Sequence, residues 1–249
     1  MEKQRIKPYI FGHRGAMGYE IENTMPSFRK AVETGAGIET DVQLTKDNVL
    51  VCFHDTYFSI NNKHYEVKEL NLKELKKIKF QDKRVIPTLE EVFLEFLDEN
   101  TDLRFSFDIF DKETGIELIK LSKKFEILEN IEITDLRIDV LSHLRKHDKK
   151  TNLVHTLPLD ILDINSQQFL FKEMIDNHIN IINVKADKNR LRTNLTSIID
   201  HGFKCYCWGV NYKSQMKKVL KWKYKNEFVK AIYTNYPDVL ICLRDKFFS

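Results

Sequence analysis

Glu39 and Asp41 are two carboxylates separated by a single residue within an apolar run that reads as a strand. Residues two apart project from the same face of a strand, so these side chains point together. Converging carboxylates repel each other unless a positive charge lies between them, and a hard divalent cation is the simplest candidate. The alternative is a solvated pair on an exposed strand face. The apolar residues on both sides argue against exposure and favour a metal site.

His13, Arg14 and His54 flank this pair in the sequence, and each follows a short apolar run. The ordinary pKa of histidine, about 6.5, lets one imidazole accept a proton while another donates one near neutral pH. This arrangement predicts acid–base chemistry. A lone histidine is more often structural, and that interpretation is given to the remaining ones: His64, His143, His147, His155, His178 and His201.

Short motifs that contain these residues continue along nearly the whole chain: His13-Arg14-Gly15, Glu22-Asn23-Thr24, Glu39-x-Asp41-Val42, Thr45-Lys46-Asp47, His54-Asp55, and the segments 86–91, 208–211 and 233–238. Each motif is a weak signal by itself. Their order matches that of the glycerophosphodiester phosphodiesterase family, which the chain therefore resembles. The resemblance implies a (β/α)8 barrel that hydrolyses glycerophosphodiesters to sn-glycerol 3-phosphate and an alcohol.

The resemblance also implies which residues carry the chemistry. Glu39, Asp41 and the carboxylate at Asp108 would bind a divalent metal, and ligands that are all oxygen favour Mg²⁺ or Ca²⁺ over zinc. His13 and His54 would be the acid–base pair.

Two further roles follow from the resemblance, since Arg14 would contact the phosphate and Trp208 would help to form the wall of the pocket. A phosphodiester is an anion that repels nucleophiles, so its hydrolysis needs positive charge beside the non-bridging oxygens. Arg14 and the metal would supply that charge.

The chain departs from the family pattern at several positions. Asp108 stands where a glutamate is usual, and Phe110 stands where a lysine is usual. Aspartate is one methylene shorter, so the metal must shift or a water must fill the gap. Loss of the lysine removes positive charge from the phosphate site. Lys185 is a candidate replacement for the missing lysine, and the alternative is that Lys185 is simply solvated. Near the site, Ile21 stands where a proline is usual and Asn235 stands where an aspartate is usual.

Strand-like apolar runs alternate with segments of helical spacing, which predicts a (β/α)8 barrel rather than an open sheet. The expected barrel strands cover residues 8–11, 38–44, 103–109, 131–134, 153–155, 179–184, 205–210 and 231–234. The residues named above fall at the carboxyl ends of these strands, where barrel enzymes carry their active groups. The whole chain, residues 1–249, is expected to form one domain.

One segment does not follow the alternation. A strand at 49–53 is expected to pair with the second barrel strand, and residues 56–84 are irregular after it. They predict a small insertion, with a turn at Asn61-Asn62 and a short helix at 70–78.

The composition is that of a globular protein, with 42% apolar residues, 31% charged residues and a net charge of +3. A dedicated nucleic-acid-binding protein carries a much larger positive charge than this, so no nucleic-acid partner is expected. The N-terminus lacks the apolar core of a signal peptide, and no apolar run reaches membrane-spanning length. The cysteines, at positions 52, 205, 207 and 242, do not resemble a disulfide framework. A reduced, cytoplasmic protein is therefore expected.

Two other functions remain open. A lysophospholipase D or sphingomyelinase D-like enzyme would also use a Glu-x-Asp pair with a third aspartate. Phe110 and Trp208 would give such an enzyme an apolar pocket for a lysophospholipid substrate. The second alternative is a catalytically inactive protein that binds phosphodiesters, because the usual lysine is missing.

The segment from Lys213 to Lys230 carries seven lysines interleaved with aromatic residues. One interpretation is a solvated helix followed by a loop. The other is weak contact with an anionic membrane surface, to which each basic residue adds about 1 kcal/mol. The sequence does not indicate an oligomeric state.

Overall fold

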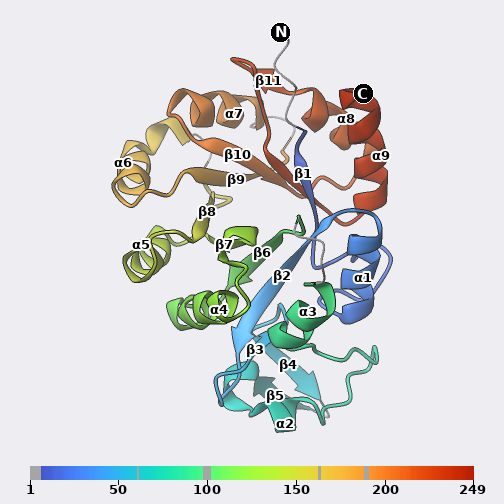
Figure 1. Ribbon diagram of the computed structural model, residues 1–249. Coiled ribbons are helices and arrows are strands. Elements are labelled where there is room, and N and C mark those ends of the chain that lie inside the picture. The colour runs from blue at the N-terminus through green and yellow to red at the C-terminus, as the bar shows by residue number, and fades with distance from the viewer. Residues whose placement is uncertain (1–6, 61, 98–101, 162–163, 188–190) are drawn as a thin grey trace.

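Eight parallel strands close into a barrel in the computed structural model, which describes residues 7–60, 62–97, 102–161, 164–187 and 191–249 (Figure 1). The strands follow one another around the barrel in chain order: β1 (Tyr9–Gly12), β2 (Gly37–Leu44), β6 (Phe105–Ile109), β7 (Ile131–Asp135), β8 (Asn152–Thr156), β9 (Ile181–Lys185), β10 (Lys204–Trp208) and β13 (Ala231–Thr234). Phe11 of β1 pairs with Gly37 on one side and with Tyr233 on the other, which closes the ring. The predicted (β/α)8 barrel is confirmed.

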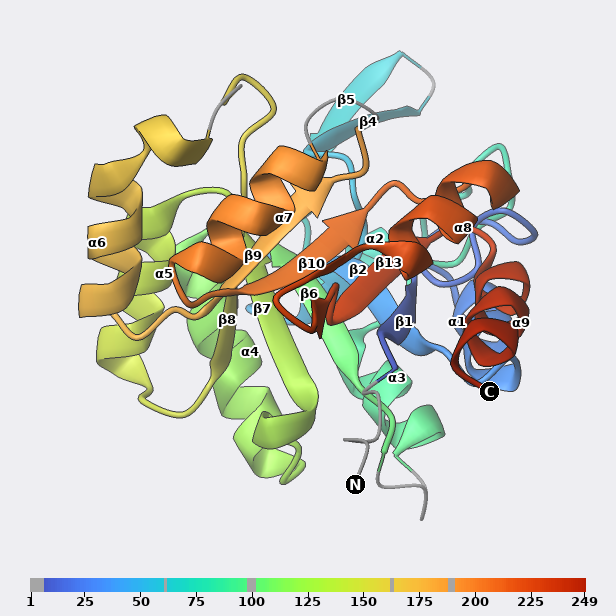
Figure 2. The same ribbon diagram turned by 90° about the horizontal axis from the view of Figure 1, so that it is seen from above.

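Helices separate the barrel strands along the chain and pack outside the ring (Figure 2). They are α1 (Met25–Glu33), α3 (Leu89–Phe96), α4 (Lys112–Lys124), α5 (Ile138–His147), α6 (Gln168–Asp176), α7 (Leu191–Asp200), α8 (Lys213–Lys221) and α9 (Pro237–Phe248). Their apolar faces form the main core with the outward side chains of the strands. Within the described ranges, we find no helix with the length and apolar character that a membrane span requires.

Side chains along each strand alternate between this outer core and the interior of the barrel. Phe11 and Tyr233 face inward and stack, with ring centroids 5.1 Å apart. Tyr206 also faces inward, whereas Cys205 and Cys207 on either side of it face the outer core and form no disulfide. The expected packing role of these two cysteines is confirmed.

An ion pair between Arg104 and Glu132 lies at the amino ends of the barrel strands. Arg104 lies over the ring of Tyr9, with its guanidinium carbon 4.5 Å from the ring centroid. Its Nη2 donates hydrogen bonds to Glu132 Oε1 and, over 3.0 Å, to the hydroxyl of Tyr206. The side chain of Glu132 is only 3% exposed, so Arg104 is the cation that allows this carboxylate to be buried.

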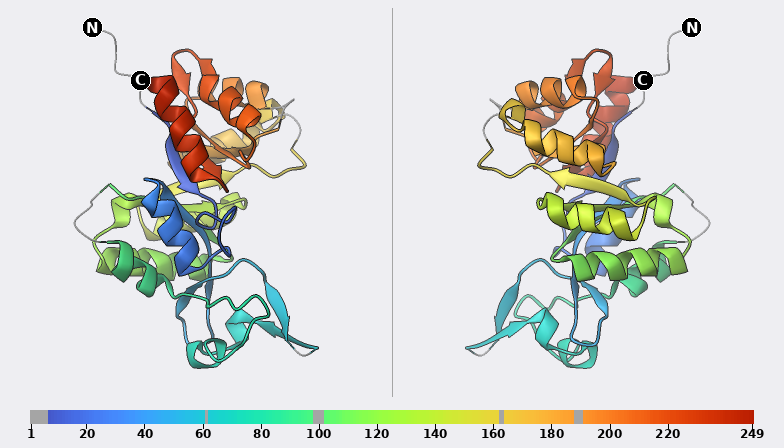
Figure 3. Two further views of the ribbon diagram at one scale, coloured as in Figure 1. Left: turned by 90° about the vertical axis from the view of Figure 1, so that its right-hand side faces the viewer. Right: turned by 90° about the vertical axis from the view of Figure 1, so that its left-hand side faces the viewer.

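The insertion between β2 and α3 holds more regular structure than the sequence indicated (Figure 3). β3 (Leu50–Cys52) pairs antiparallel with β2, as predicted. It is followed by a projecting hairpin of β4 (Tyr57–Ile60) and β5 (Lys63–Glu66), and then by the short helix α2 (Leu72–Leu75). The prediction of an irregular segment is therefore wrong at the hairpin, and the helix is shorter than the predicted 70–78. Asn62 has the positive φ of a turn residue, whereas Asn61 lies outside the described residues.

A small apolar core of its own holds the insertion together. It comprises Val51, Phe53, Phe58, Val67, Leu75 and Ile86. Phe58 of the hairpin packs edge-on against Phe53, with centroids 5.6 Å apart. The hairpin is thus stabilised by residues outside it, which is why its own sequence pattern did not reveal it.

The basic segment from Lys213 to Lys230 begins as α8, but the loop predicted after the helix is a second hairpin. This hairpin consists of β11 (Lys223–Tyr224) and β12 (Glu227–Phe228). Lys225 and Asn226 between them both have positive φ, 47° and 67°, as a two-residue type I′ turn requires.

This second hairpin lies at the amino ends of the barrel strands. The amide of Tyr9, at the start of β1, donates a hydrogen bond of 2.9 Å to the carbonyl of Lys230, and Figure 1 shows β11 near the start of β1. Membrane contact through this segment stays a prediction. Such contact would leave the carboxyl ends of the strands, called the mouth below, facing away from the membrane.

Replacing Arg104 by methionine should destabilise the fold by about 3 kcal/mol, because it leaves the Glu132 carboxylate buried without its cation. Urea denaturation gives the measurement, through the midpoint of unfolding. The double variant Arg104→Met, Glu132→Gln should recover part of the loss, since no buried charge is stranded. Equal midpoints for the parent and the single variant would contradict this role for the ion pair.

Candidate active site

Three carboxylates from two neighbouring strands meet at the mouth. Glu39 and Asp41 come from β2 and Asp108 comes from β6, and the parallel register places Asp41 beside Asp108. One oxygen from each carboxylate lies within 4.8 Å of the other two. The structure therefore brings together the three residues that the sequence indicated as metal ligands.

Burial and mutual repulsion change the acidity of this cluster. Burial raises the pKa of Glu39, and the neighbouring charges of Asp108 and Asp41 raise it further. Burial, followed by the charges of Asp41 and Asp135, raises the pKa of Asp108 to about 8. Asp108 is an exposed residue that lines the cavity, whereas Glu39 and Asp41 are buried. Three carboxylates with converging oxygens, of which Glu39 and Asp108 have raised pKa values, fit a divalent cation that would stabilise their ionised forms.

Arg14 is held by three contacts, two of them with the carboxylate cluster and one with Glu22. Its backbone amide donates a hydrogen bond of 2.7 Å to Glu39 Oε2, and its Nε lies 3.2 Å from Asp41 Oδ2. Its Nη1 donates to Glu22 Oε2 over 2.8 Å. Arg14 has a φ of +51°, a backbone conformation that residues other than glycine rarely adopt. The hydrogen bond from its amide to Glu39 offsets the cost of this conformation.

Asn23 supports the cluster from the same loop. Its Nδ2 donates a hydrogen bond of 2.9 Å to Asp41 Oδ2, and its Oδ1 accepts one of 2.7 Å from Thr40 Oγ1. Both side-chain atoms are used, so Asn23 fixes the rotamer of Asp41. Sequence reasoning noted Asn23 only as part of a motif and missed this contact.

His13 follows β1 and has a defined tautomer. Its Nδ1 lies 3.0 Å from Asn235 Oδ1, and because that oxygen only accepts, Nδ1 carries the proton. Burial lowers the pKa of His13, and the neighbouring charge of Arg14 lowers it further. The imidazole is therefore neutral at pH 7 and keeps Nε2 as a free acceptor, which is the state of a general base.

His54 follows β3 and has the opposite surroundings. Its Nδ1 lies 2.8 Å from Asp55 Oδ1, and its side chain is 43% exposed. The Asp55 carboxylate can accept a hydrogen bond from the Nδ1 of His54, which orients the ring.

A cavity of about 210 Å³ joins these groups. It is lined by seven residues that the sequence indicated and by three that it did not: His13, Arg14, Glu39, Asp41, His54, Asp108 and Trp208, and then Thr156, Asn183 and Tyr233. The additional residues come from β8, β9 and β13. The signal that could have found Thr156 and Asn183 is a polar side chain at an inward position of a buried strand.

Two of the predicted substrate-binding residues do not line this cavity. Lys185 lies beside it, with Nζ 5.3 Å from the ring centroid of Trp208. Phe110 follows β6 and is half-buried, and its carbonyl accepts a hydrogen bond of 2.8 Å from Arg137 Nη2. Contact of either side chain with a substrate stays a prediction.

Comparison with known proteins places this site in context. The model of the glycerophosphoryl diester phosphodiesterase family matches residues 13–239. The glycerophosphodiester phosphodiesterase of Caldanaerobacter subterraneus subsp. tengcongensis is 30% identical, over 96% of this chain and 98% of its own length.

Solved structures of similar proteins share the barrel. That of a glycerophosphodiester phosphodiesterase from Thermotoga maritima has a TM-score of 0.76 and 23% identity, covering 95% of this chain and 98% of that one. A phosphodiesterase from Oleispira antarctica, solved with the product sn-glycerol-3-phosphate, has a TM-score of 0.77 and 19% identity, covering 96% and 97%. The family match spans most of the chain, so this protein belongs to the glycerophosphoryl diester phosphodiesterase family, a family of phosphoric diester hydrolases.

Proposed function

We propose that the protein hydrolyses glycerophosphodiesters to sn-glycerol 3-phosphate and an alcohol, with a divalent metal and two histidines. The observation that carries the proposal is the cavity in which His13 and His54 face the three carboxylates beside Arg14. The names of the similar proteins, and the product bound by one of them, support this choice of substrate. Purified protein incubated with glycerophosphocholine and Mg²⁺ or Ca²⁺ provides the direct test.

The electrostatic design of the cavity suits an anionic diester. Mg²⁺ or Ca²⁺, held by Glu39, Asp41 and Asp108, would supply positive charge for the non-bridging oxygens. Arg14 adds a fixed guanidinium on the same side, oriented by Glu22. Two polar atoms in the wall, Trp208 Nε1 and Asn183 Oδ1, are buried without a hydrogen-bond partner among the described residues and are available to the substrate.

The two histidines divide the proton transfers. His13, neutral and with Nε2 free, removes a proton from the attacking hydroxyl or water. His54, with Asp55 behind it, donates a proton to the leaving alkoxide. Asn235 and Asp55 each contact the Nδ1 of one of these imidazoles, which leaves Nε2 of both rings for the proposed proton transfers.

A lipid phosphodiesterase of the lysophospholipase D or sphingomyelinase D type is the second candidate. Asp108 supports it, because that site would also use a third aspartate. A protein that binds phosphodiesters without turnover would retain substrate affinity but release no alcohol, which the same assay reveals.

Alanine at either histidine should lower kcat by about a hundredfold or more, since a positioned acid or base commonly contributes that much. Steady-state assays of His13→Ala and His54→Ala with glycerophosphocholine measure the loss, and circular dichroism checks the fold. Near-parental turnover in either variant would remove that residue from the mechanism.

Changing Asn235 to aspartate should shift the pH dependence of kcat/KM. A carboxylate at Nδ1 favours the imidazolium, so the pKa of His13 should rise and the general base should stay protonated to higher pH. The acid limb of the profile should therefore move to higher pH in Asn235→Asp. An unmoved limb, with Asn235→Leu as a second comparison, would show that His13 does not act as the base.

Without metal, the stability of the protein should fall as pH rises. Asp108 titrates at about 8 in the folded protein, against an ordinary 3.8, so between these values the folded state holds a proton that the unfolded chain has lost. The free energy of unfolding in chelator should decrease across that window.

In Asp108→Asn the free energy of unfolding should decrease less with pH, because asparagine has no titrating proton. Mg²⁺ or Ca²⁺ should raise Tm most at the alkaline end, where the ligands are ionised. Thermal unfolding at several pH values measures the parent in chelator, Asp108→Asn in chelator, and the parent with metal. A Tm in chelator that is independent of pH would contradict the repulsion among these carboxylates.

A further inference from the structure

The unpartnered atoms of Asn183 and Trp208 in the wall of the active-site cavity are of opposite kinds. Asn183 Oδ1 can only accept a hydrogen bond, whereas Trp208 Nε1 can only donate one. Asn183 is 5% exposed, so its oxygen has little access to bulk water. A buried polar atom without a partner costs free energy, and a ligand that pairs with it removes that cost.

Both atoms belong to the wall opposite the carboxylate cluster. The strand of Asn183, β9, is four strands from β2 in either direction around the ring, and β10 with Trp208 lies next to it. Asn183 and Trp208 take inward positions, as Ile181 and Tyr206 do on the same strands. The ester groups of a phosphodiester bound at the cluster must occupy the rest of the cavity, which this wall bounds.

The chemistry of the Asn183 oxygen decides which part of a ligand it pairs with. An ionised phosphodiester has only acceptor oxygens, and choline has neither an N–H nor an O–H group. In glycerophosphocholine the only donors are therefore the glyceryl hydroxyls. A hydroxyl both donates and accepts, so the glyceryl group can also pair with Trp208 Nε1.

Neighbouring side chains orient both groups. Asn183 Nδ2 donates a hydrogen bond of 3.3 Å to Thr156 Oγ1 on the adjacent strand β8, which leaves Oδ1 as the free atom of the amide. Lys185 Nζ is 5.3 Å from the centroid of the Trp208 ring, and this cation–π contact restrains the indole. Because the χ2 torsion of asparagine is broad, the amide can turn further toward a ligand at little cost.

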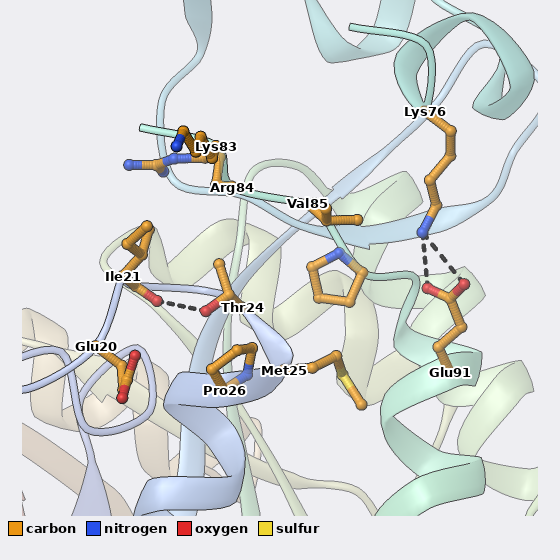
Figure 4. Close-up of a pocket in the computed structure, with 11 residues that line it drawn as sticks. Glu20, Ile21, Thr24, Met25, Pro26, Lys76, Lys83, Arg84, Val85 and Glu91 are labelled. Atoms are coloured by element: carbon orange, nitrogen blue, oxygen red, sulfur yellow. Dashed lines mark hydrogen bonds and ion pairs between the residues drawn. The ribbon is translucent and has the colours of Figure 1, made fainter. Parts of the chain in front are cut away.

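The larger groove beside the mouth, called the outer groove below, makes no such demand on a ligand. It has a volume of about 290 Å³, and its lining includes Ile21, Arg84 and Val85. Figure 4 shows these side chains with the Lys76–Glu91 ion pair at one end. Among its lining residues, all of which the structure describes, we find no buried polar atom that lacks a partner.

We propose that Asn183 Oδ1 accepts a hydrogen bond from a glyceryl hydroxyl of the substrate, and that Trp208 Nε1 donates one to the same glyceryl group. Asn183 thus selects substrates with free hydroxyls, because an analogue without them leaves the buried oxygen unpaired. The inference rests on the phosphodiesterase function proposed above and names the residues that recognise the glyceryl group.

The test compares glycerophosphocholine with propylphosphocholine, which has the same phosphodiester group but no hydroxyl. The measured quantity is the ratio of kcat/KM for the first substrate over the second. Asn183→Leu, which has a similar volume but no polar side-chain atom, should lower this ratio by about tenfold through the loss of one hydrogen bond. A preference that arises from the metal is common to parent and variant, so the change in the ratio reports on Asn183.

Two further variants assign the atoms. Asn183→Asp keeps an acceptor oxygen and loses the amide donor, so it should retain most of the parental ratio even if both substrates react more slowly. Trp208→Phe keeps an aromatic ring and loses the N–H group, so it should lower the ratio by about two- to tenfold. An unchanged ratio in Trp208→Phe would overturn the role of the indole.

Asn152→Leu is the matched control, because Asn152 is an asparagine of the neighbouring strand β8 that does not line the cavity. Its Nδ2 donates instead to the carbonyls of Glu129 and Ile131, each over 3.3 Å. The control should keep the parental ratio. Equal ratios in the parent and Asn183→Leu, or equal losses in Asn183→Leu and Asn183→Asp, would overturn the proposal.

A binding measurement separates this inference from the proposed function. Calorimetric titration with sn-glycerol 3-phosphate and with propyl phosphate, in the presence of Mg²⁺, requires no turnover. Tighter binding of sn-glycerol 3-phosphate by the parent, with the affinity ratio about tenfold smaller in Asn183→Leu, supports the inference even if catalysis fails. An affinity ratio that is the same in both proteins overturns it. Failure of the proposed function shows separately, as absence of choline release from glycerophosphocholine.

Discussion

Repulsion among Glu39, Asp41 and Asp108 is the constraint around which the site is built. The β2–β6 register brings the three carboxylates together, and burial denies Glu39 and Asp41 the hydration that would stabilise their charges. Arg14 supplies a single positive charge at one edge of the cluster. The divalent cation proposed above would offset the remaining repulsion and would also neutralise charge on a bound phosphodiester.

The loop after β1 holds the carboxylates in position. Arg14 and Asn23 both adopt positive φ, and each is held there by a hydrogen bond to a carboxylate of the cluster. The same loop carries His13, the partner Glu22, and the apolar residues of the outer groove. The contacts that hold these two backbone conformations therefore also orient Glu39 and Asp41.

The insertion between β2 and α3 places further side chains beside the loop after β1. It supplies Arg84 and Val85 to the groove from a segment that packs on its own small core. Its distance from the loop after β1 in the sequence is large, but Arg84 and Arg14 lie on the two oxygens of one carboxylate. The insertion, which also carries His54 to the cavity, thus meets the loop after β1 at Glu22.

The sequence by itself determined the barrel, the strand faces and seven of the residues that line the cavity, because strand periodicity and motif order are local properties of the chain. Tertiary structure alone decided the partners of those residues, such as Asn235 for His13 and Asn23 for Asp41. It also decided the two hairpins and the outer groove. The side-chain partners and the packing of the first hairpin on Phe53 depend on contacts between segments that only the folded barrel brings together, whereas the second hairpin is a local turn that the lysine-rich sequence did not reveal.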